Sequence, residues 1–137
     1  MPRRSERWPF QASVEGLFQQ LLLLQREGFD FDIRREYVFH PTRKWRADFF
    51  LSGPRLKPII VEYNGLFERN GHSSLNSGHR SVAGVMKDWS KGNEAQLLGI
   101  LYLQFGPAET KTGDSMNVIA RALKMRLESA TKATTTP

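Results

Sequence analysis

The apolar and polar positions along the chain fall into blocks, first with the spacing of a helix and then with the spacing of short strands. Apolar residues recur at helical intervals over 17–24, Ser13 is a suitable N-cap, and Gly28 is a suitable stop signal. These features predict a first helix. The segment 30–34 mixes polar and apolar residues, and we expect it to be a loop.

Three strand-like runs follow, over 36–40, 45–51 and 57–63. Each is closed by Pro or Gly, and the third contains the β-branched run Ile59-Ile60-Val61. Because the connections between these runs are short, the pattern favours an antiparallel meander.

The second half of the chain begins with a polar segment rich in Gly and Ser over 66–80, which we expect to be a long loop. A helix is expected from 81 or 82 to 98, a strand over 100–105, and a last helix that begins at Asp114 or Ser115. This order predicts one α/β domain over 13–128. We expect a mixed four-stranded sheet flanked by helices, with the last helix packed on the core. A basic arm over 1–12 and a flexible tail over 129–137 complete the expected organisation.

Composition narrows the function classes. The chain has 137 residues, of which 39% are hydrophobic, and this argues against intrinsic disorder. It contains no cysteine, which excludes disulfide scaffolds, Cys-ligated zinc and iron–sulfur sites. We find no apolar run long enough for a membrane span and no signal-peptide pattern at the start. The net charge of +6 favours an anionic partner, with nucleic acid first.

The candidate chemistry lies in Asp48 and, fourteen residues later, Glu62. Side chains alternate along a strand, so Glu62 and Asn64 are expected on one face, and a meander can bring Asp48 beside Glu62. Two converging carboxylates require a cation, because like charges placed side by side are costly. Their hard oxygen atoms suit Mg²⁺, or alternatively Mn²⁺.

The residues around these carboxylates extend the pattern. The relevant segments are Arg35–Phe49, Val61–Gly65, Gly78-His79, Gly84, Asp88, Lys91, Asn93 and Gln96–Phe105. They resemble small phage and prophage endonucleases related to the very-short-patch-repair group, within the PD-(D/E)XK (restriction-endonuclease-like) nuclease superfamily. The resemblance covers residues 13–106 and implies an αβββαβ core, the order derived above. It also implies Mg²⁺-dependent hydrolysis of DNA.

Carried over by position, the resemblance implies that Asp48 and Glu62 are metal ligands. It also implies that Glu15 is the acidic residue that the first helix turns toward the site. Asn64 occupies the position of the superfamily's lysine, and an amide supplies no positive charge. The resemblance allows the lysine to come from the second predicted helix, where Lys91 and Lys87 lie one turn apart.

Further candidate residues would position the nucleic acid. His79 could contact the scissile phosphate or act as a general acid. Basic side chains before Asp48 and around the second helix are candidates for phosphate contacts. These are Arg43, Lys44, Arg46, His79, Arg80 and Lys87.

Each candidate also has an ordinary structural explanation. Asp48 could form an ion pair with Arg46 or Arg43, and Glu62 could likewise be structural. Glu15 could only favour the helix dipole, and Asn64-Gly65 could simply be a turn. Lys91, His79 and the basic run 43–46 could be solvated surface residues.

The functional hypothesis is therefore a metal-dependent endodeoxyribonuclease that uses water as its nucleophile. It would be encoded by a phage or prophage and located in the cytoplasm of a bacterial host, and a homodimer is compatible with this hypothesis. The alternatives are a catalytically silent DNA-binding member of the same fold, a nuclease for branched DNA or RNA, and a phage protein that inhibits a host protein. No membrane partner is expected.

Overall fold

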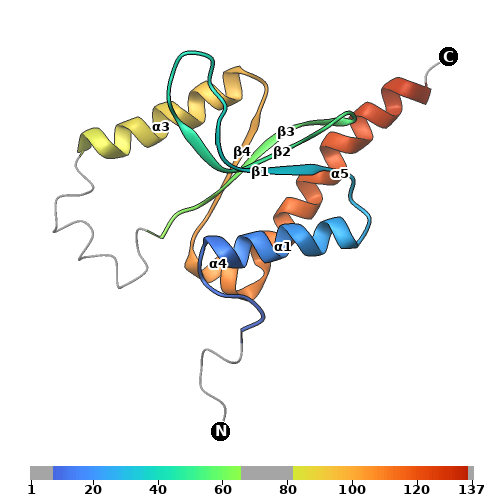
Figure 1. Ribbon diagram of the computed structural model, residues 1–137, viewed down its shortest axis with the longest axis horizontal. Coiled ribbons are helices and arrows are strands. Elements are labelled where there is room, and N and C mark those ends of the chain that lie inside the picture. Colours follow the sequence, from blue (N-terminus) through green and yellow to red (C-terminus); the bar gives the residue numbers. More distant parts are fainter. Residues whose placement is uncertain (1–7, 66–81, 136–137) are drawn as a thin grey trace, which may run out of the picture.

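The computed structural model describes the backbone of residues 8–65 and 82–135, and the side chains of residues 8–65 and 89–127 (Figure 1). The described part confirms the predicted order of elements and adds one short helix. In chain order the elements are α1 (Val14–Arg26), β1 (Asp32–Val38), β2 (Arg46–Gly53), β3 (Leu56–Tyr63), α3 (Val82–Leu97), β4 (Leu101–Phe105), α4 (Pro107–Thr112) and α5 (Asp114–Thr135).

The four strands form one mixed sheet in the order β1-β2-β3-β4. The pairs β1–β2 and β2–β3 are antiparallel, which confirms the meander, and β3–β4 is parallel. A parallel pair needs a long crossover connection, and α3 lies in the one between β3 and β4. The predicted mixed four-stranded sheet flanked by helices, with an additional C-terminal helix, is therefore confirmed.

Helix α1 shows how local sequence sets the boundaries. The Ser13 side chain accepts a hydrogen bond from the Gly16 N–H at 3.1 Å, which is the expected N-cap. After the helix, Gly28 has a φ of +111°, a conformation that glycine adopts without strain. Both predicted end signals therefore act as expected.

The prediction of a loop over 30–34 is wrong. Strand β1 begins at Asp32, and Ile33 pairs with Leu51. This strand lies at the sheet edge and is mostly exposed, so its sequence lacks the apolar alternation that marks a half-buried strand. The strand predicted over 36–40 is accordingly displaced toward the N-terminus.

Helix α4 was not predicted from the sequence, although its end signals are present. Pro107 stands at its start, and Gly113, with a φ of +89°, stands at its end. Helix α5 begins at Asp114, as predicted, and its backbone continues to Thr135. Regular structure thus extends into the segment 129–137, whose flexibility stays a prediction.

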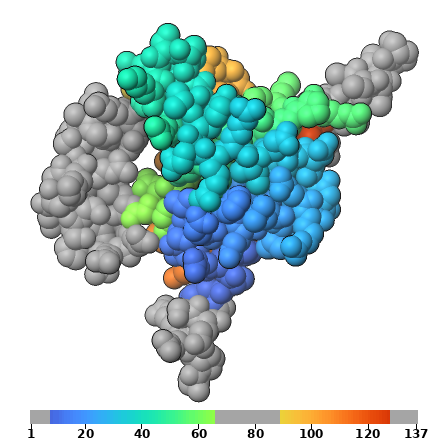
Figure 2. Space-filling view, viewed as in Figure 1, coloured from blue at the N-terminus to red at the C-terminus, as the bar shows by residue number. Residues whose placement is uncertain are grey.

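The segment 39–45 connects β1 to β2 and forms an outer corner of the described surface, in teal in Figure 2. Its ring systems pack against one another: Trp45 lies 5.3 Å from His40 and 6.4 Å from Phe39, measured between ring centroids. His40 Nε2 also lies 3.1 Å from Glu94 Oε1 of α3. The connection is therefore anchored to α3.

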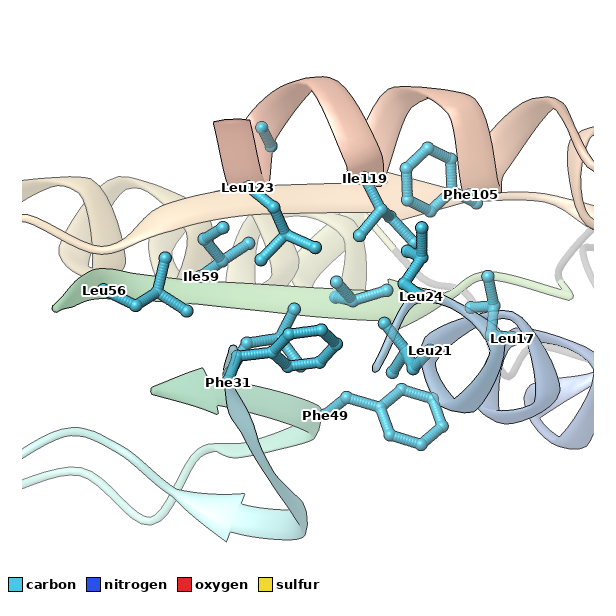
Figure 3. Close-up of a cluster of buried hydrophobic side chains, with 13 residues drawn as sticks. Leu17, Leu21, Leu24, Phe31, Phe49, Leu56, Ile59, Phe105, Ile119 and Leu123 are labelled. Atoms are coloured by element: carbon cyan, nitrogen blue, oxygen red, sulfur yellow. The ribbon is translucent and has the colours of Figure 1, made fainter. Parts of the chain in front are cut away.

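The main core lies between one face of the sheet and helices α1 and α5 (Figure 3). Its fully buried members include Leu17, Leu21, Phe49, Ile59 and Ile119. The opposite face is covered by α3 and has a much smaller buried cluster, formed by Ala47, Ile60, Ala95 and Ile100. The α1 side thus supplies most of the apolar burial, which leaves the α3 side for polar groups.

Across residues 8–65 and 82–135, no helix combines the length and the apolar character that crossing a membrane would require.

The core assignment can be tested with two neighbouring leucines of α1. Leu21 is 0% exposed, whereas Leu22 is 44% exposed. Leu21→Ala should lower the free energy of unfolding by about 2–5 kcal/mol, because it removes apolar contacts and leaves a cavity. Leu22→Ala is the matched control and should cost less than about 1 kcal/mol. Urea unfolding measures both, and equal losses would contradict this placement of α1.

Candidate functional site

The polar face of the sheet brings together residues from three strands and one helix. Asp48 of β2, Glu62 of β3 and Tyr102 of β4 lie on the face covered by α3, and Lys91 reaches them from α3. For Glu62 alternation explains this placement, because its neighbour Val61 lies in the main core. In β2 the alternation is interrupted at Asp48, since Ala47 and Phe49 belong to clusters on opposite faces of the sheet. The sequence-based expectation that Asp48 would lie beside Glu62 is confirmed.

Strands β2 and β3 separate at this point. Their regular pairing stops at Phe49 and Val61, and β3 continues alongside β4. Beyond that pair, the Asp48 N–H donates to Glu62 Oε2 at 3.3 Å, and the Tyr63 N–H donates to Asp48 Oδ2 at 2.9 Å. Each carboxylate thus accepts a hydrogen bond from the main chain of the facing strand. The two negative charges are therefore fixed close together by the backbone itself.

Lys91 supplies the opposite charge. Its Nζ lies 2.7 Å from Glu62 Oε2 and donates to the Arg46 carbonyl at 2.5 Å. The side chains of Lys91 and Glu62 are only 16% and 12% exposed, so this ion pair is largely removed from water. The Tyr102 hydroxyl donates to Glu62 Oε1. Glu62 therefore joins β3, β4 and α3 through one side chain.

The electrostatics of Asp48 reflect this crowding. Burial raises the pKa of Asp48 above its ordinary value, and the negative charges of Glu62 and Glu36 raise it further. The hydrogen bond from Tyr63 and the charge of Lys91 act in the opposite direction on this pKa without cancelling the rise. Asp48 is consequently a carboxylate whose ionised form would gain from a further cation.

The number and the chemistry of the oxygen donors decide whether this site suits Mg²⁺. Within the described residues, no group of three or more His, Cys, Asp or Glu side chains is arranged to hold a metal ion. Mg²⁺, however, is commonly bound through one or two carboxylates, with water and substrate phosphates as its other ligands. Asp48 and Glu62 would then be the protein ligands, as expected from the sequence.

Two residues near the site were not found by sequence reasoning. Tyr102 could have been placed on this face by alternation along β4, but only once its parallel pairing with Ile60 was known. Glu36 interrupts the register of β1 with β2 and has a φ of +52°, which is unusual for a residue with a side chain. The backbone strain and the effect of Glu36 on the Asp48 pKa had no signal in the sequence.

The structure brings other candidates into different surroundings. Glu15 forms an ion pair with Arg35, 2.6 Å between Oε1 and Nη2, and the Arg35 guanidinium lies over the ring of Phe18. This pair lies on the α1 side of the sheet, opposite to Lys91. Asn64 follows β3, and its N–H donates to the Phe105 carbonyl at 2.8 Å, so the chain still runs beside β4 there.

The basic candidates before Asp48 are exposed and close to the site. Arg43 lies over the Trp45 ring at 4.7 Å, and Lys44 is also exposed. Arg46 offers its carbonyl to Lys91, which links this segment to the carboxylates. His79 and Arg80 lie outside the described residues, as does the side chain of Lys87, so their predicted roles stay predictions.

Comparisons with protein-family models, with curated proteins and with solved structures gave no match for this chain.

The raised pKa of Asp48 leads to a test of stability. Between the ordinary and the raised pKa the folded state binds more protons than the unfolded state, so the free energy of unfolding falls as pH rises through that window. Asp48→Asn removes the charge and retains an oxygen for the Tyr63 N–H, so its Tm should equal or exceed that of the wild type at neutral pH. This advantage should shrink in mildly acidic buffer.

Thermal unfolding in EDTA at the two pH values measures this effect. Asp30→Asn is a suitable control, because Asp30 is exposed and lies by Gly53, near the end of β2 away from the site. A clear fall in Tm for Asp48→Asn alone would show that the Asp48 charge is a stabilising structural group, contrary to this account.

Proposed function

We propose that this chain is a metal-dependent endodeoxyribonuclease of the PD-(D/E)XK type. The observation that carries the proposal is the convergence of Asp48, Glu62 and Lys91 where β2 and β3 separate. Two carboxylates beside one largely buried lysine are an unusual concentration of charge for a surface where two strands merely end. Metal-dependent phosphodiester hydrolysis uses cation-binding oxygen atoms, and a fixed positive charge nearby stabilises the transition state.

In this proposal Asp48 and Glu62 would hold Mg²⁺ or Mn²⁺. A bound divalent cation supplies positive charge to the attacked phosphodiester and makes water a better nucleophile. The Tyr63 N–H fixes one oxygen of Asp48, and the Tyr102 hydroxyl fixes one oxygen of Glu62, so neither carboxylate has to be ordered when substrate arrives. The raised pKa of Asp48 means that protons compete with the cation in acidic buffer.

Lys91 would stabilise negative charge that develops on the phosphate. Its ammonium group is already positioned by Glu62 and the Arg46 carbonyl. This arrangement supports the idea that Lys91 replaces the strand lysine whose position Asn64 occupies. The exposed side chains of Arg43, Lys44 and Arg46 would contact phosphates of the duplex and position it.

One observation favours a second candidate function, a DNA-binding protein without catalytic activity. Both oxygen atoms of Glu62 already accept hydrogen bonds, from Lys91 and from Tyr102. If these contacts persist when DNA binds, Glu62 has reduced capacity as a metal ligand. Such a protein would show salt-dependent DNA affinity, with a log–log slope near −0.9 for each phosphate contact, and no cleavage.

The remaining expectations belong to the same proposal. A phage or prophage origin, a bacterial cytoplasmic location and a possible homodimer would each suit an enzyme that acts on cellular DNA. A nuclease for RNA or branched DNA would use the same charged groups, so the substrate panel has to include both. Inhibition of a host protein would instead give tight protein binding without salt-dependent DNA affinity.

The direct test is cleavage of plasmid, mismatched, branched and single-stranded DNA, and of RNA, in Mg²⁺, Mn²⁺ and EDTA. Asp48→Asn and Glu62→Gln should each reduce metal-dependent cleavage at least about 100-fold, because partners of metal ligands alone cost about 10- to 100-fold. Both variants should retain cooperative unfolding and DNA binding. Asp30→Asn should cut normally. Unchanged cleavage in both site variants would contradict the assignment, and absence of cleavage on every substrate would favour the second candidate.

The proposed role of Lys91 gives a separate prediction. Lys91→Ala should slow cleavage by roughly 10²–10³-fold, the usual effect of removing one positioned donor to an oxyanion. DNA affinity should change little if Lys91 acts in the cleavage step. If Lys91 were only a phosphate contact, its loss would weaken binding and lower the salt slope by about one unit. Adding Asn64→Lys to this variant should restore part of the rate.

Circular dichroism has to accompany this experiment, because Lys91 also pairs with Glu62. Lys124→Ala is the matched control, since Lys124 is an exposed lysine of α5. If folded Lys91→Ala cuts at the normal rate, the positive charge has another source.

A further inference from the structure

A hollow of about 430 Å³ lies beside the charged cluster, between α3 and β4. This volume is within the usual range for small-ligand pockets, about 300–1,000 Å³. The lining consists of two aromatic rings, three amide side chains and one glycine. These residues are Trp89, Gly92, Asn93, Gln96, Tyr102 and Gln104.

The helical side of the pocket follows one stripe of α3. Trp89, Gly92, Asn93 and Gln96 are spaced at i, i+3, i+4 and i+7, so they occupy a single face of the helix. Trp89 is 65% exposed, which leaves much of its indole ring available for contact. Gly92 has no side chain to narrow the hollow, and a Cβ added there would lie 3.5 Å from the Tyr102 ring.

Tyr102 connects this pocket to the candidate active site. Its ring lines the pocket, and its hydroxyl donates to Glu62 Oε1. A group seated against the Tyr102 ring would therefore lie within one side chain's length of the carboxylates. A ligand in the pocket would thus lie next to a group that reacts at Asp48 and Glu62.

The lining has the chemistry of a nucleobase site. Bases that are out of the helical stack bind to proteins by stacking on aromatic rings and by hydrogen bonds to their edges. Trp89 and Tyr102 provide rings, and Asn93, Gln96 and Gln104 provide amides, each with a donor and an acceptor. The three amide residues are exposed, so a base edge can exchange their contacts with water for direct hydrogen bonds, which an apolar ligand cannot do. A phosphate would find no positive charge among the six lining residues.

We infer that this pocket binds an unpaired nucleobase of the DNA next to the phosphodiester that is cut. The inference rests on the proposed function and adds a substrate class, namely DNA with an unpaired base displaced from the duplex, as at a single-nucleotide bulge. The base would stack against Trp89 and be held by the amides of α3 and β4. Paired duplex DNA would contact the basic segment 43–46 but leave the pocket unused.

The test compares two DNA duplexes that differ only in one base. One carries a single bulged adenine nucleotide, and the other carries an abasic nucleotide at the same bulge, so both have the same charge and a similar bend. Fluorescence anisotropy in EDTA gives the affinity of the full chain for each. The adenine bulge should bind roughly 5- to 150-fold more tightly, the range that stacking of one base provides.

Variants locate the source of this preference. Trp89→Ala should bring the affinity ratio close to one, and Trp89→Phe should keep part of it. Gly92→Leu should also lower the ratio, because the new side chain fills the hollow while leucine favours a helix more than glycine does. Leu97→Ala is the control on the same helix, since Leu97 is exposed and does not line the pocket, and it should keep the full ratio.

The outcomes separate the two proposals. Equal affinity for both bulges, together with Mg²⁺-dependent cleavage that needs Asp48, would overturn the base pocket and leave the nuclease in place. A preference that persists in both Trp89→Ala and Gly92→Leu would also overturn the pocket. Lack of DNA affinity in any form would overturn the proposed function and this inference with it.

Discussion

The candidate site depends on the separation of β2 and β3 after the pair Phe49 and Val61. Where two strands part, their N–H groups lose main-chain acceptors and still require hydrogen bonds. Here the carboxylates of Asp48 and Glu62 accept them, each from the opposite strand. The hydrogen bonds that these main-chain N–H groups require therefore hold two negative charges close together. The repulsion between the two carboxylates creates the need for a cation.

The rest of the α3 side follows from that need. Lys91 brings its charge to Glu62, and His40 meets Glu94, so polar contacts hold α3 over the sheet together with a small apolar cluster. The other face carries the large core with α1 and α5. The face packed against α1 and α5 therefore provides most of the stability. The α3 side can hold repelling negative charges because the fold does not depend on that side for its stability.

Sequence reasoning succeeded where burial leaves a periodic pattern. The leucines of α1 and the β-branched run of β3 are buried, so their spacing predicted both elements and the fold class. It failed for the start of β1, because an exposed edge strand has no such pattern. In the site, alternation and the meander paired Asp48 with Glu62. The parts that depend on long-range geometry, namely Tyr102 at Glu62 and the strained Glu36, could not be derived from local sequence.

The position of the positive charge has a mechanical consequence under the proposed function. A lysine at the position of Asn64 would be fixed relative to Glu62 by strand geometry alone. The position of the Lys91 ammonium group instead depends on where α3 lies. Helix α3 is held to the segment 39–45 by the contact between His40 and Glu94, and to the start of β2 by the hydrogen bond from Lys91 to the Arg46 carbonyl. The same segment carries the exposed basic side chains that would contact phosphates. Contact with DNA and placement of the charge would therefore be physically linked, because both act through this connection between β1 and β2.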